Sequence, residues 1–306
     1  MGQIIRIERI NAGEFDVSPI MDIASKKIKN RFSGNYVSPT FTKGWQDCPT
    51  RQLVQNVAVN NKPKSSAAIL GTIVHMMYQH MQDDWYPKTE QEIFEKWDKE
   101  AKVHHKVDYD ALNDEDKSEV LKTALWYVNQ YLEMPDYLPG SKLLLKDVWK
   151  QEGVQVHSEF FMRVDNFELF NQRLPTLTNL LDRLDFRDDD IYVIDYKTGL
   201  ENNGDHKLQF MIYSWGVQKL YGIKPHCFIV SPGTKEKFVP ITWTKREESV
   251  ALEGIFKVNT EVKASVITGN FPRRENKWCS MCNIAEACLG GLPYAEVEIN
   301  EDKINV

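Results

Sequence analysis

The sequence lacks a long hydrophobic run, since no apolar stretch approaches the roughly 18 residues that a membrane-spanning helix needs. Its start, MGQIIRIERINAGEFDVS, includes charged residues early and has no apolar block of the secretory type. The Met-Gly start matches only part of an N-myristoylation site, because position 6 is Arg6 rather than Ser or Thr. We therefore expect a soluble, intracellular protein in the cytoplasm, without a membrane partner.

The chain also lacks an excess of positive charge, because 38 Lys and Arg stand against 44 Asp and Glu, for a net charge of −6. This balance argues against a generic basic coat for nucleic acid. It does not exclude a nuclease, because metal-binding carboxylates add negative charge and a DNA channel needs only local Lys and Arg. The phosphate loop G-x-x-x-x-G-K-[ST] is absent as well, so any unwinding of DNA would need a partner.

The chain has few cysteines, and their number is odd. The five cysteines are Cys48, Cys227, Cys279, Cys282 and Cys288. An intracellular chain rarely uses cysteines for disulfides. A scattered buried thiol is the simplest interpretation of Cys227, but it does not suit the three cysteines that crowd into WCSMCNIAEAC.

The hydrophobic periodicity predicts an α/β fold, with a mixed β-sheet core flanked by helices. Helical patterns cover 19–28, 38–57, 67–82, 88–136, 206–222 and 247–269, and extended patterns cover 154–164, 177–186, 190–198, 226–232 and 238–243. Pro49 is expected to interrupt the second helical pattern. We expect a single domain over 1–306. Its parts would include a helical insertion or subdomain at 88–136, a cluster-binding segment at 270–292 and a tail at 293–306.

Two neighbouring extended runs, LLDRLDF and IYVIDYKT, carry acidic residues inside apolar patterns. Side chains alternate across a strand with a period of two, so Asp195 and Lys197 share one face. The acidic segment between the runs suits a tight turn, which would pair them as an antiparallel hairpin. The hairpin can bring Asp182 beside Asp195 and Lys197, whereas Asp185 should point to the opposite face and is a weaker candidate.

Two converging carboxylates form a hard oxygen site that suits Mg²⁺ or Mn²⁺. A nearby lysine can hold or deprotonate a water beside the metal, and this combination suits metal-assisted hydrolysis of a phosphodiester. The alternative is a solvated hairpin with an ordinary salt bridge, which short acidic patterns often form.

Further motifs carry a resemblance to a known family. They are SPTFTKGWQDCP with Cys48, GTIVH with His75, LLDRLD with Asp182, IDYKTG with Asp195 and Lys197, LQFMIY with Gln209 and Tyr213, NFP, and the C-x2-C-x5-C trio. Together and in this order they resemble the PD-(D/E)XK nuclease superfamily. Within it they resemble the RecB-like branch with an iron–sulfur cluster, which includes CRISPR-associated adaptation exonucleases and AddB-type nuclease domains. One departure is Asn179, which stands where the family usually has Gly.

The resemblance implies a restriction-endonuclease-like fold and a role for each matched residue. It implies that Mg²⁺ or Mn²⁺ is bound by His75, Asp182, Asp195 and the backbone carbonyl of Tyr196. Lys197 would then orient or activate water, and Gln209 and Tyr213 would support the site. Taken alone, the histidine also suits a core position, and the Gln–Tyr pair suits a partly buried amphipathic helix. Glu159 is a weaker candidate for an accessory carboxylate, since a surface Glu is the more common case.

For the cysteines, the resemblance implies a [4Fe–4S] cluster. Its ligands would be Cys48, Cys279, Cys282 and Cys288, and it would staple the N-terminal helix to the C-terminal segment. The spacing alone equally allows a structural zinc ion. Basic residues flank these cysteines, namely Lys43, Arg51, Arg273, Arg274 and Lys277, and they suit either contacts with DNA phosphates or solvated charges. Trp45 and Trp278 suit stacking on bases or shielding of the cluster.

The expected function is that of a metal-dependent DNA exonuclease, acting on single-stranded ends or strands in DNA recombination, repair or processing. A structure-specific endonuclease and a DNA-binding recombination module with little nuclease activity are the alternatives. The expected partners are DNA and either a helicase or a single-strand annealing protein. Enzymes of this branch serve phage or plasmid recombination, DNA repair and CRISPR adaptation, and the sequence does not decide between these pathways.

Overall fold

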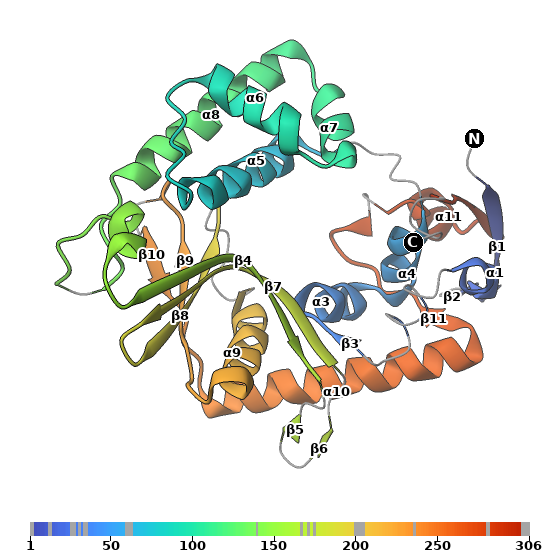
Figure 1. The fold of residues 1–306 in the computed structure, drawn as a ribbon. Helices are drawn as coiled ribbons and strands as arrows, with labels where there is room; N and C mark the ends of the chain where they lie inside the picture. The colour runs from blue at the N-terminus through green and yellow to red at the C-terminus, as the bar shows by residue number, and fades with distance from the viewer. Residues whose placement is uncertain are drawn as a thin grey trace. The chain divides into compact units, whose positions relative to one another are not determined.

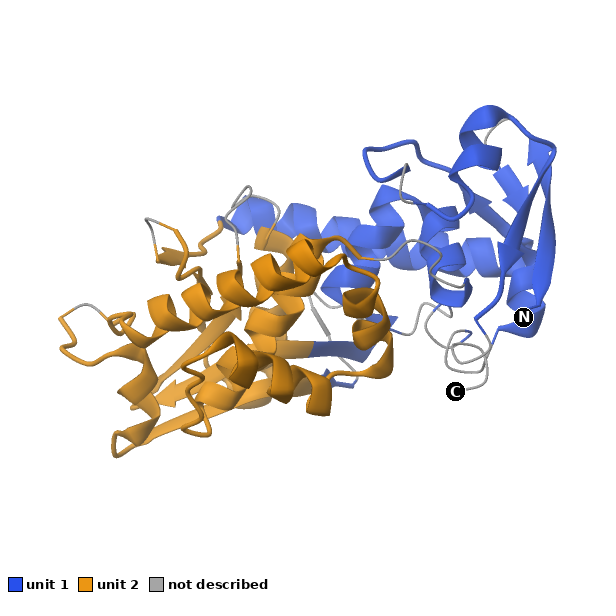
Figure 2. Ribbon diagram, turned by 90° about the horizontal axis from the view of Figure 1, so that it is seen from above, with its two compact units in different colours: residues 1–62, 163–179, 244–306 blue, residues 63–162, 180–243 orange. Residues whose placement is uncertain are grey.

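The computed structural model describes most of the chain (Figure 1). The described residues are 3–11, 14–24, 29, 32, 36–58, 64–138, 140–165, 168–169, 172–173, 176–198, 206–234, 237–279 and 282–300. The chain divides into two compact units, each described by itself below (Figure 2). Unit 1 comprises 1–62, 163–179 and 244–306, and unit 2 comprises 63–162 and 180–243. Within the described residues, no helix is long and apolar enough to span a membrane.

The sheet of unit 2 is mixed, as expected. It has the order β10-β9-β8-β7, and β4 also pairs with β7. The strands are β4 (Val154–Val164), β7 (Thr176–Arg187), β8 (Asp190–Tyr196), β9 (His226–Val230) and β10 (Phe238–Pro240). β8 runs antiparallel to β7 and parallel to β9, while β10 runs antiparallel to β9.

Helices cover both faces of this sheet (Figure 1). They are α5 (Ser66–Met81), α6 (Glu90–Glu100), α7 (Val103–Asp110), α8 (Asp114–Leu132), the 3₁₀ helix η1 (Leu145–Lys150) and α9 (Lys207–Tyr221). The helices α5 to α8 bury their apolar faces against Tyr192, Ile194 and Tyr196 of β8. On the other face, Tyr221 of α9 packs edge-on against Phe186 of β7. The two layers therefore enclose the central hairpin.

The helices expected over 88–136 are α6, α7 and α8. Trp97 and Tyr131 are fully buried, whereas Leu121 and Leu125 are half-buried at the edge of the same core. The side chain of Asn113 caps α8 by accepting a hydrogen bond from the Asp116 N–H. The description of α6, α7 and α8 as an insertion or subdomain stays a prediction.

The hairpin of β7 and β8 has the predicted antiparallel pairing. Arg183 pairs with Ile194 and Asp185 with Tyr192. The turn between the strands consists of two residues, and Asp188 adopts a left-handed φ of 52° there, a conformation that Asp tolerates better than most residues. One step beyond Arg183 in this register, Asp182 comes opposite Asp195.

Unit 1 contains a second sheet, with the order β11-β2-β1-β12. Its strands are β1 (Ile4–Asn11), β2 (Glu14–Asp16), β11 (Asn270–Pro272) and β12 (Tyr294–Glu298), all antiparallel. β12 lies in the expected tail of weak pattern. It pairs with β1 because Ala295 and Val297 alternate inward and are buried. The last residues of that tail, 301–306, lie outside the described residues.

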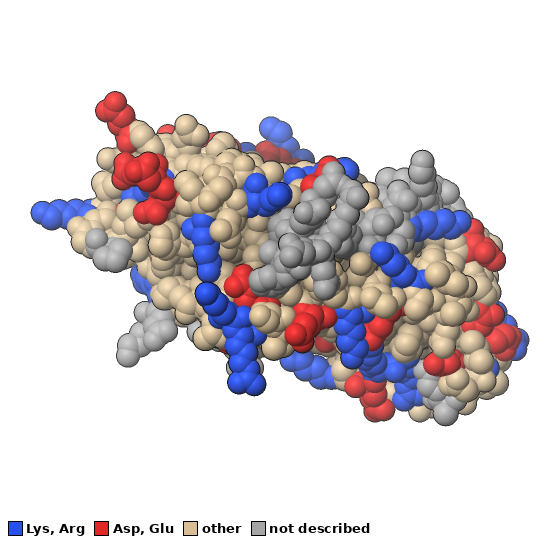
Figure 3. Space-filling model, turned by 90° about the horizontal axis from the view of Figure 1, so that it is seen from below, with Lys and Arg blue, Asp and Glu red and all other residues tan. Residues whose placement is uncertain are grey.

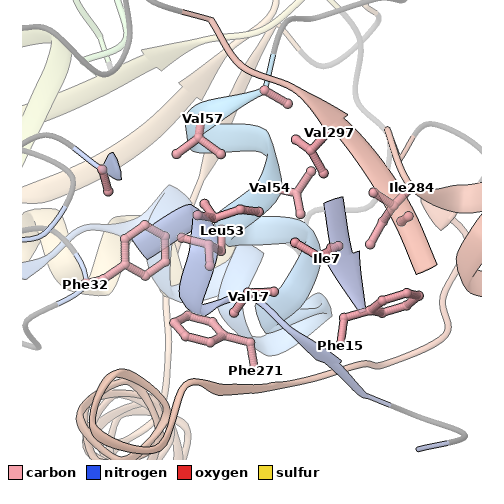
Figure 4. Packing of buried hydrophobic residues seen from close by; sticks show 14 of the residues in the cluster. Ile7, Phe15, Val17, Phe32, Leu53, Val54, Val57, Phe271, Ile284 and Val297 are labelled. Carbon is pink, nitrogen blue, oxygen red and sulfur yellow. The ribbon is translucent and has the colours of Figure 1, made fainter. Parts of the chain in front are cut away.

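The helices of unit 1 pack around this sheet. They are α1 (Ser18–Ile23), α3 (Pro39–Asp47), α4 (Pro49–Val57), α10 (Lys245–Thr268) and α11 (Ala285–Gly290). Leu53, Val54 and Val57 of α4 lie at the centre of its core, with Ile7 and Phe15 from the sheet (Figure 4). α10 begins with a capping box between Thr244 and Glu247, and it ends at Gly269, as predicted, where φ is 70°.

Three short strands complete the description. β3 (Tyr36–Val37) pairs in parallel with Thr176 and Leu177 at the start of β7. β5 (Glu168–Leu169) and β6 (Gln172–Arg173) form a two-stranded antiparallel sheet.

Candidate active site and cysteine cavity

The end of β8 carries the predicted Asp-x-Lys pair in unit 2. Asp195 is 1% exposed, and its carboxylate forms an ion pair with the ammonium of Lys197, which directly follows the strand. The backbone N–H of Lys197 donates to the carbonyl of Val230 on β9 over 2.9 Å. The lysine is thus held both by its backbone and by its charge.

His75 and Asp182 meet beside this pair. The Nδ1 atom of His75, on α5, lies 3.5 Å from Oδ2 of Asp182, on β7. The same carboxylate oxygen accepts a hydrogen bond from the Tyr196 N–H over 2.8 Å. The Asp182 side chain is 16% exposed and the His75 side chain 31%, so both remain partly accessible.

Gln209 and Tyr213 of α9 lie on the same face, as their spacing predicts. Nε2 of Gln209 donates to Oδ1 of Asp195 over 2.9 Å and to the Tyr213 hydroxyl over 2.6 Å. The hydroxyl of Tyr213 in turn donates to the Leu180 carbonyl over 3.4 Å. This chain of contacts joins α9 to both strands of the hairpin and fixes the orientation of the Asp195 carboxylate.

Burial and mutual repulsion shape the electrostatics of the two acids. Burial, together with the Asp195 carboxylate, raises the pKa of Asp182 to about 6, although His75, Lys197 and the Tyr196 N–H partly offset the rise. Burial raises the pKa of Tyr213, and the Asp195 charge adds to the effect. The buried Asp195 and the half-buried Asp182 beside a single ammonium leave negative charge that a divalent cation would neutralise.

These donors fit a hard divalent cation by their chemistry, since carboxylate oxygens with an imidazole suit Mg²⁺ or Mn²⁺. In the described part of the chain, no three His, Cys, Asp or Glu side chains stand ready to hold an ion as they are. His75 is turned toward Asp182 and Lys197 toward Asp195. Binding therefore requires these side chains to rotate away from one another.

Asp185 points to the opposite face, as predicted. Its carboxylate forms a fully buried ion pair with Arg183 and accepts a hydrogen bond from the Tyr137 hydroxyl over 2.7 Å. Arg183 also donates to the hydroxyls of Tyr131 and Tyr196. The Tyr196 side chain thus faces away from the site, which leaves only its backbone to serve there.

A strained residue lies close to the site. Glu159 adopts a left-handed φ of 47° within β4, which is unusual for a non-glycine residue. Burial raises the pKa of its carboxyl, and the charge of His75 lowers it by a smaller amount. Its assignment as an accessory carboxylate stays a prediction.

The four predicted cysteine ligands line one cavity in unit 1. Cys48 separates α3 from α4 and joins Cys279, Cys282 and Cys288 around a space of about 330 Å³, which includes its opening to solvent. Cys227 lies elsewhere, buried on β9. Burial makes the largest contribution to the raised pKa of the Cys282 thiol, and the neighbouring Cys48 and Cys288 raise that pKa further.

Backbone N–H groups are directed at two of these sulfurs. The Sγ of Cys48 accepts from the N–H groups of Arg51 and Arg274, each over 3.5 Å. The Sγ of Cys279 accepts from the Asn276 N–H over 3.3 Å. Such donors stabilise thiolates and suit the ligands of a metal or cluster. The donors suit a thiolate-bound group by their chemistry, but among the described residues no three of these side chains are placed to hold a metal ion as they stand.

The basic and aromatic residues around this cavity are engaged in structural contacts. The Arg274 guanidinium donates to the carbonyls of Trp45 and Gln46 and to the carboxylate of Glu261. Arg273 donates to the Cys288 carbonyl over 3.1 Å. The suggestion that Trp45 stacks on bases is wrong, because its ring is fully buried in the core of unit 1.

Two sets of contacts near these sites had no counterpart in the sequence prediction. One is the buried network of Arg183 and Asp185, for which the i, i+2 spacing on one strand face was the available signal. The other is the hydroxyl of Tyr127 on α8, which donates to the carbonyl of Thr198 directly after Lys197. No local pattern pointed to this second contact, because 71 residues separate its partners.

A mixed sheet flanked by helices, with one acid on a central strand and Asp-x-Lys on the next, defines the class of restriction-endonuclease-like proteins. The chain belongs to the PD-(D/E)XK nuclease superfamily, whose family model matches residues 36–289. It is therefore a hydrolytic nuclease with DNA as its substrate, and members of the superfamily typically use divalent metals such as Mg²⁺.

Two solved structures were compared with this chain, both at low sequence identity. The crystal structure of a candidate exonuclease from Eubacterium rectale is 14% identical, with a TM-score of 0.50, and the match covers 85% of this chain and 90% of that one. The crystal structure of protein VC1899 from Vibrio cholerae is 10% identical over 80% of this chain and 56% of that one, with a TM-score of 0.24. The first likeness bears on the fold alone, and the second is too low to carry an argument. A search of curated proteins found no match to this chain.

Proposed function

We propose that this protein is a metal-dependent DNA exonuclease that acts on single-stranded ends or strands during recombination, repair or processing. The observation that carries the proposal is the meeting of His75 with Asp182 beside the ion pair of Asp195 and Lys197. One imidazole from α5, with two carboxylates and one ammonium from the hairpin of β7 and β8, suits hydrolysis of a phosphodiester. The pathway, and a helicase or single-strand annealing partner, are inferred from the resemblance alone.

Each residue has a separate part in the proposed reaction. Mg²⁺ or Mn²⁺ would be held by four groups, namely His75, Asp182, Asp195 and the carbonyl of Tyr196. When bound, the ion polarises the phosphoryl oxygen and lowers the pKa of bound water. The ammonium of Lys197 leaves its pair with Asp195 and orients the attacking water.

The α9 residues keep the acid in position during this exchange. The amide of Gln209 holds Oδ1 of Asp195, so the second oxygen is left to face the ion. The hydroxyl of Tyr213 fixes that amide. Since burial raises the pKa of this tyrosine, its hydroxyl stays protonated at neutral pH and acts as a hydrogen-bonding group.

We also propose that Cys48, Cys279, Cys282 and Cys288 hold a [4Fe–4S] cluster with a structural role. The cluster would staple the junction of α3 and α4 to segment 270–292. Their common cavity and the N–H groups directed at the sulfurs support this assignment. A structural Zn²⁺ is the alternative, because zinc accepts the same four thiolates.

DNA would be contacted by local rather than general positive charge. On the surface shown in Figure 3, Lys and Arg side chains are interspersed with Asp and Glu, in keeping with the net charge of −6. Binding that depends on few phosphate contacts should weaken only moderately with added salt. We expect the protein in the cytoplasm, where DNA intermediates are accessible.

One preparation tests the activity and the cofactor together. The protein is purified without oxygen, its visible spectrum and its iron and zinc contents are measured, and it is incubated with Mn²⁺ and end-labelled DNA. We expect a brown protein that degrades linear single strands and leaves covalently closed single-stranded circles intact. Cleavage of the circles would instead identify an endonuclease, and zinc without iron would contradict the cluster.

The binding-module alternative predicts a different result from the same preparation. Such a module would shift single-stranded DNA in a gel without metal and would release no nucleotides when Mn²⁺ is added. That outcome would overturn the exonuclease proposal.

A further inference from the structure

Tyr196, Lys197 and Thr198 follow one another in the chain, and each is held by a contact with another element of unit 2. The side chain of Tyr196 lies in the buried group with Arg183 and Tyr131. The Lys197 N–H donates to the carbonyl of Val230. The carbonyl of Thr198 accepts a hydrogen bond from the Tyr127 hydroxyl. Side chains of α8 therefore contact the residues on both sides of the lysine, at the Tyr196 hydroxyl and at the Thr198 backbone carbonyl.

Tyr127 and Tyr131 are four residues apart on α8, so they lie on one face of the helix. Tyr131 is fully buried and Tyr127 is 8% exposed. One tyrosine reaches the last residue of β8, and the other reaches the second residue after the strand. Their spacing along α8 brackets the lysine between them.

The Tyr127 ring is confined in its place. Trp126 contacts it edge-on, with ring centroids 5.0 Å apart. Gly233, in the loop after β9, lies so close that an added Cβ would come within 2.5 Å of Cε1 of Tyr127 and 2.9 Å of Cζ3 of Trp126. Any side chain at this glycine would thus displace the phenol.

Thr198 itself lies against α5. A Cβ added to Gly71 would stand 3.8 Å from the Thr198 hydroxyl oxygen, and Gly71 precedes His75 by one helical turn. The hydroxyl of Tyr127 thus fixes a residue that adjoins both the lysine and the helix of the proposed histidine ligand.

We propose that Tyr127 is a positioning residue that aims Lys197 at the attacking water through the carbonyl of Thr198. This inference rests on the proposed nuclease function. β8 ends at Tyr196, so Lys197 lies just beyond the strand. Any shift of its backbone therefore moves the ammonium at the end of its long side chain. Small displacements of reacting groups cost large factors in rate.

The test is the variant Tyr127→Phe, which keeps the ring and removes the donor. We expect kcat on linear single-stranded DNA to fall by about tenfold, in line with the loss of one hydrogen bond that aligns a reacting group. The KM for DNA and the Mn²⁺ concentration for half-maximal rate should stay within twofold of wild type, because the metal and DNA contacts are unchanged.

Two further variants keep the inference refutable. Gly233→Ala should show the same loss of kcat with an intact tyrosine, because the added methyl group displaces its ring. Tyr86→Phe is the matched control, since it removes a tyrosine hydroxyl that donates to Asp84 elsewhere in unit 2. The control should retain full kcat.

The outcomes separate the two proposals. Wild-type kcat in Tyr127→Phe would overturn the positioning role while leaving the nuclease proposal intact. Equal losses in kcat and in Mn²⁺ affinity, with a lowered melting temperature, would show a merely structural role and would also overturn it. A wild-type protein that cleaves no DNA would refute the proposed function itself.

Discussion

Replacing Asp182 with Asn should stabilise the metal-free protein at neutral pH, although it removes a central residue of the proposed site. Burial and the Asp195 carboxylate raise the pKa of Asp182 from an ordinary 3.8 to about 6. The folded protein therefore binds this proton more tightly than the unfolded chain does. Its stability falls as pH rises from about 4 to 6, and the loss is complete above the folded pKa.

The size of the effect follows from the shift. One pKa unit corresponds to about 1.4 kcal/mol, so a rise from 3.8 to about 6 lowers the free energy of unfolding by about 3 kcal/mol at pH 8. Asp182→Asn removes this cost and should raise the melting temperature by roughly 5 °C. Well below pH 3.8 both states carry the proton, so the two proteins should melt alike.

Thermal unfolding with and without Mn²⁺ provides the assay. In buffer without divalent ions at pH 8, the variant should melt above wild type. Added Mn²⁺ should raise the melting temperature of wild type strongly and that of Asp182→Asn little, because only wild type offers both carboxylates to the ion. The matched control is Asp83→Asn, whose side chain is 79% exposed and should change neither value.

One result would refute the reasoning. If metal-free Asp182→Asn melts below wild type at pH 8, the Asp182 carboxylate is stabilised in the fold, and burial together with repulsion from Asp195 does not outweigh its favourable contacts.

Four other variants, one of them a control, have expected outcomes. Gln209→Ala should lower kcat about tenfold with an unchanged melting temperature, because Asp195 loses its hydrogen-bond donor; full activity would contradict this. Cys48→Ser should lose bound iron or zinc and melt earlier, whereas Cys227→Ser should retain the metal, and metal analysis checks both. Asp185→Ala should cost about 3–5 kcal/mol in urea unfolding, because it leaves a buried arginine unpaired; a cost below 1 kcal/mol would show that the pair is not needed.

The hairpin that carries the proposed catalytic residues could be predicted from the sequence. Its strands alternate with a period of two, and the polar turn between them leaves a single compact pairing. That pairing puts Asp182 opposite Asp195 and directs Asp185 to the other face, as observed. The geometry is local, so the sequence contains what is needed to derive it.

The contacts made by α8 could not be predicted in the same way. Tyr127 and Tyr131 of α8, and Tyr137 in the segment after it, meet the strand residues only after the helix packs on the sheet. An apolar pattern shows that a helix is buried, but it does not show which polar atoms on the two layers will face one another. The partners are more than 45 residues apart in sequence.

The cysteine cavity was predictable in its members but not in its surroundings. Ser38 caps α3 as expected, and Pro49 follows the break at Cys48. The role of Arg274 was not foreseen, because its contacts with the carbonyls at the end of α3 exist only in the folded unit. From the sequence alone, a basic residue beside a cysteine motif suits a contact with DNA as well as it suits a structural contact within the protein.

The central claim is most directly tested by comparing the rates at which wild type and Asp195→Ala degrade linear DNA in Mn²⁺. Thermal unfolding first shows that the variant is folded. The account predicts rapid degradation by wild type and a loss of at least about a thousandfold in the variant, because the best-buried carboxylate of the site is gone. Undiminished degradation by Asp195→Ala would contradict it.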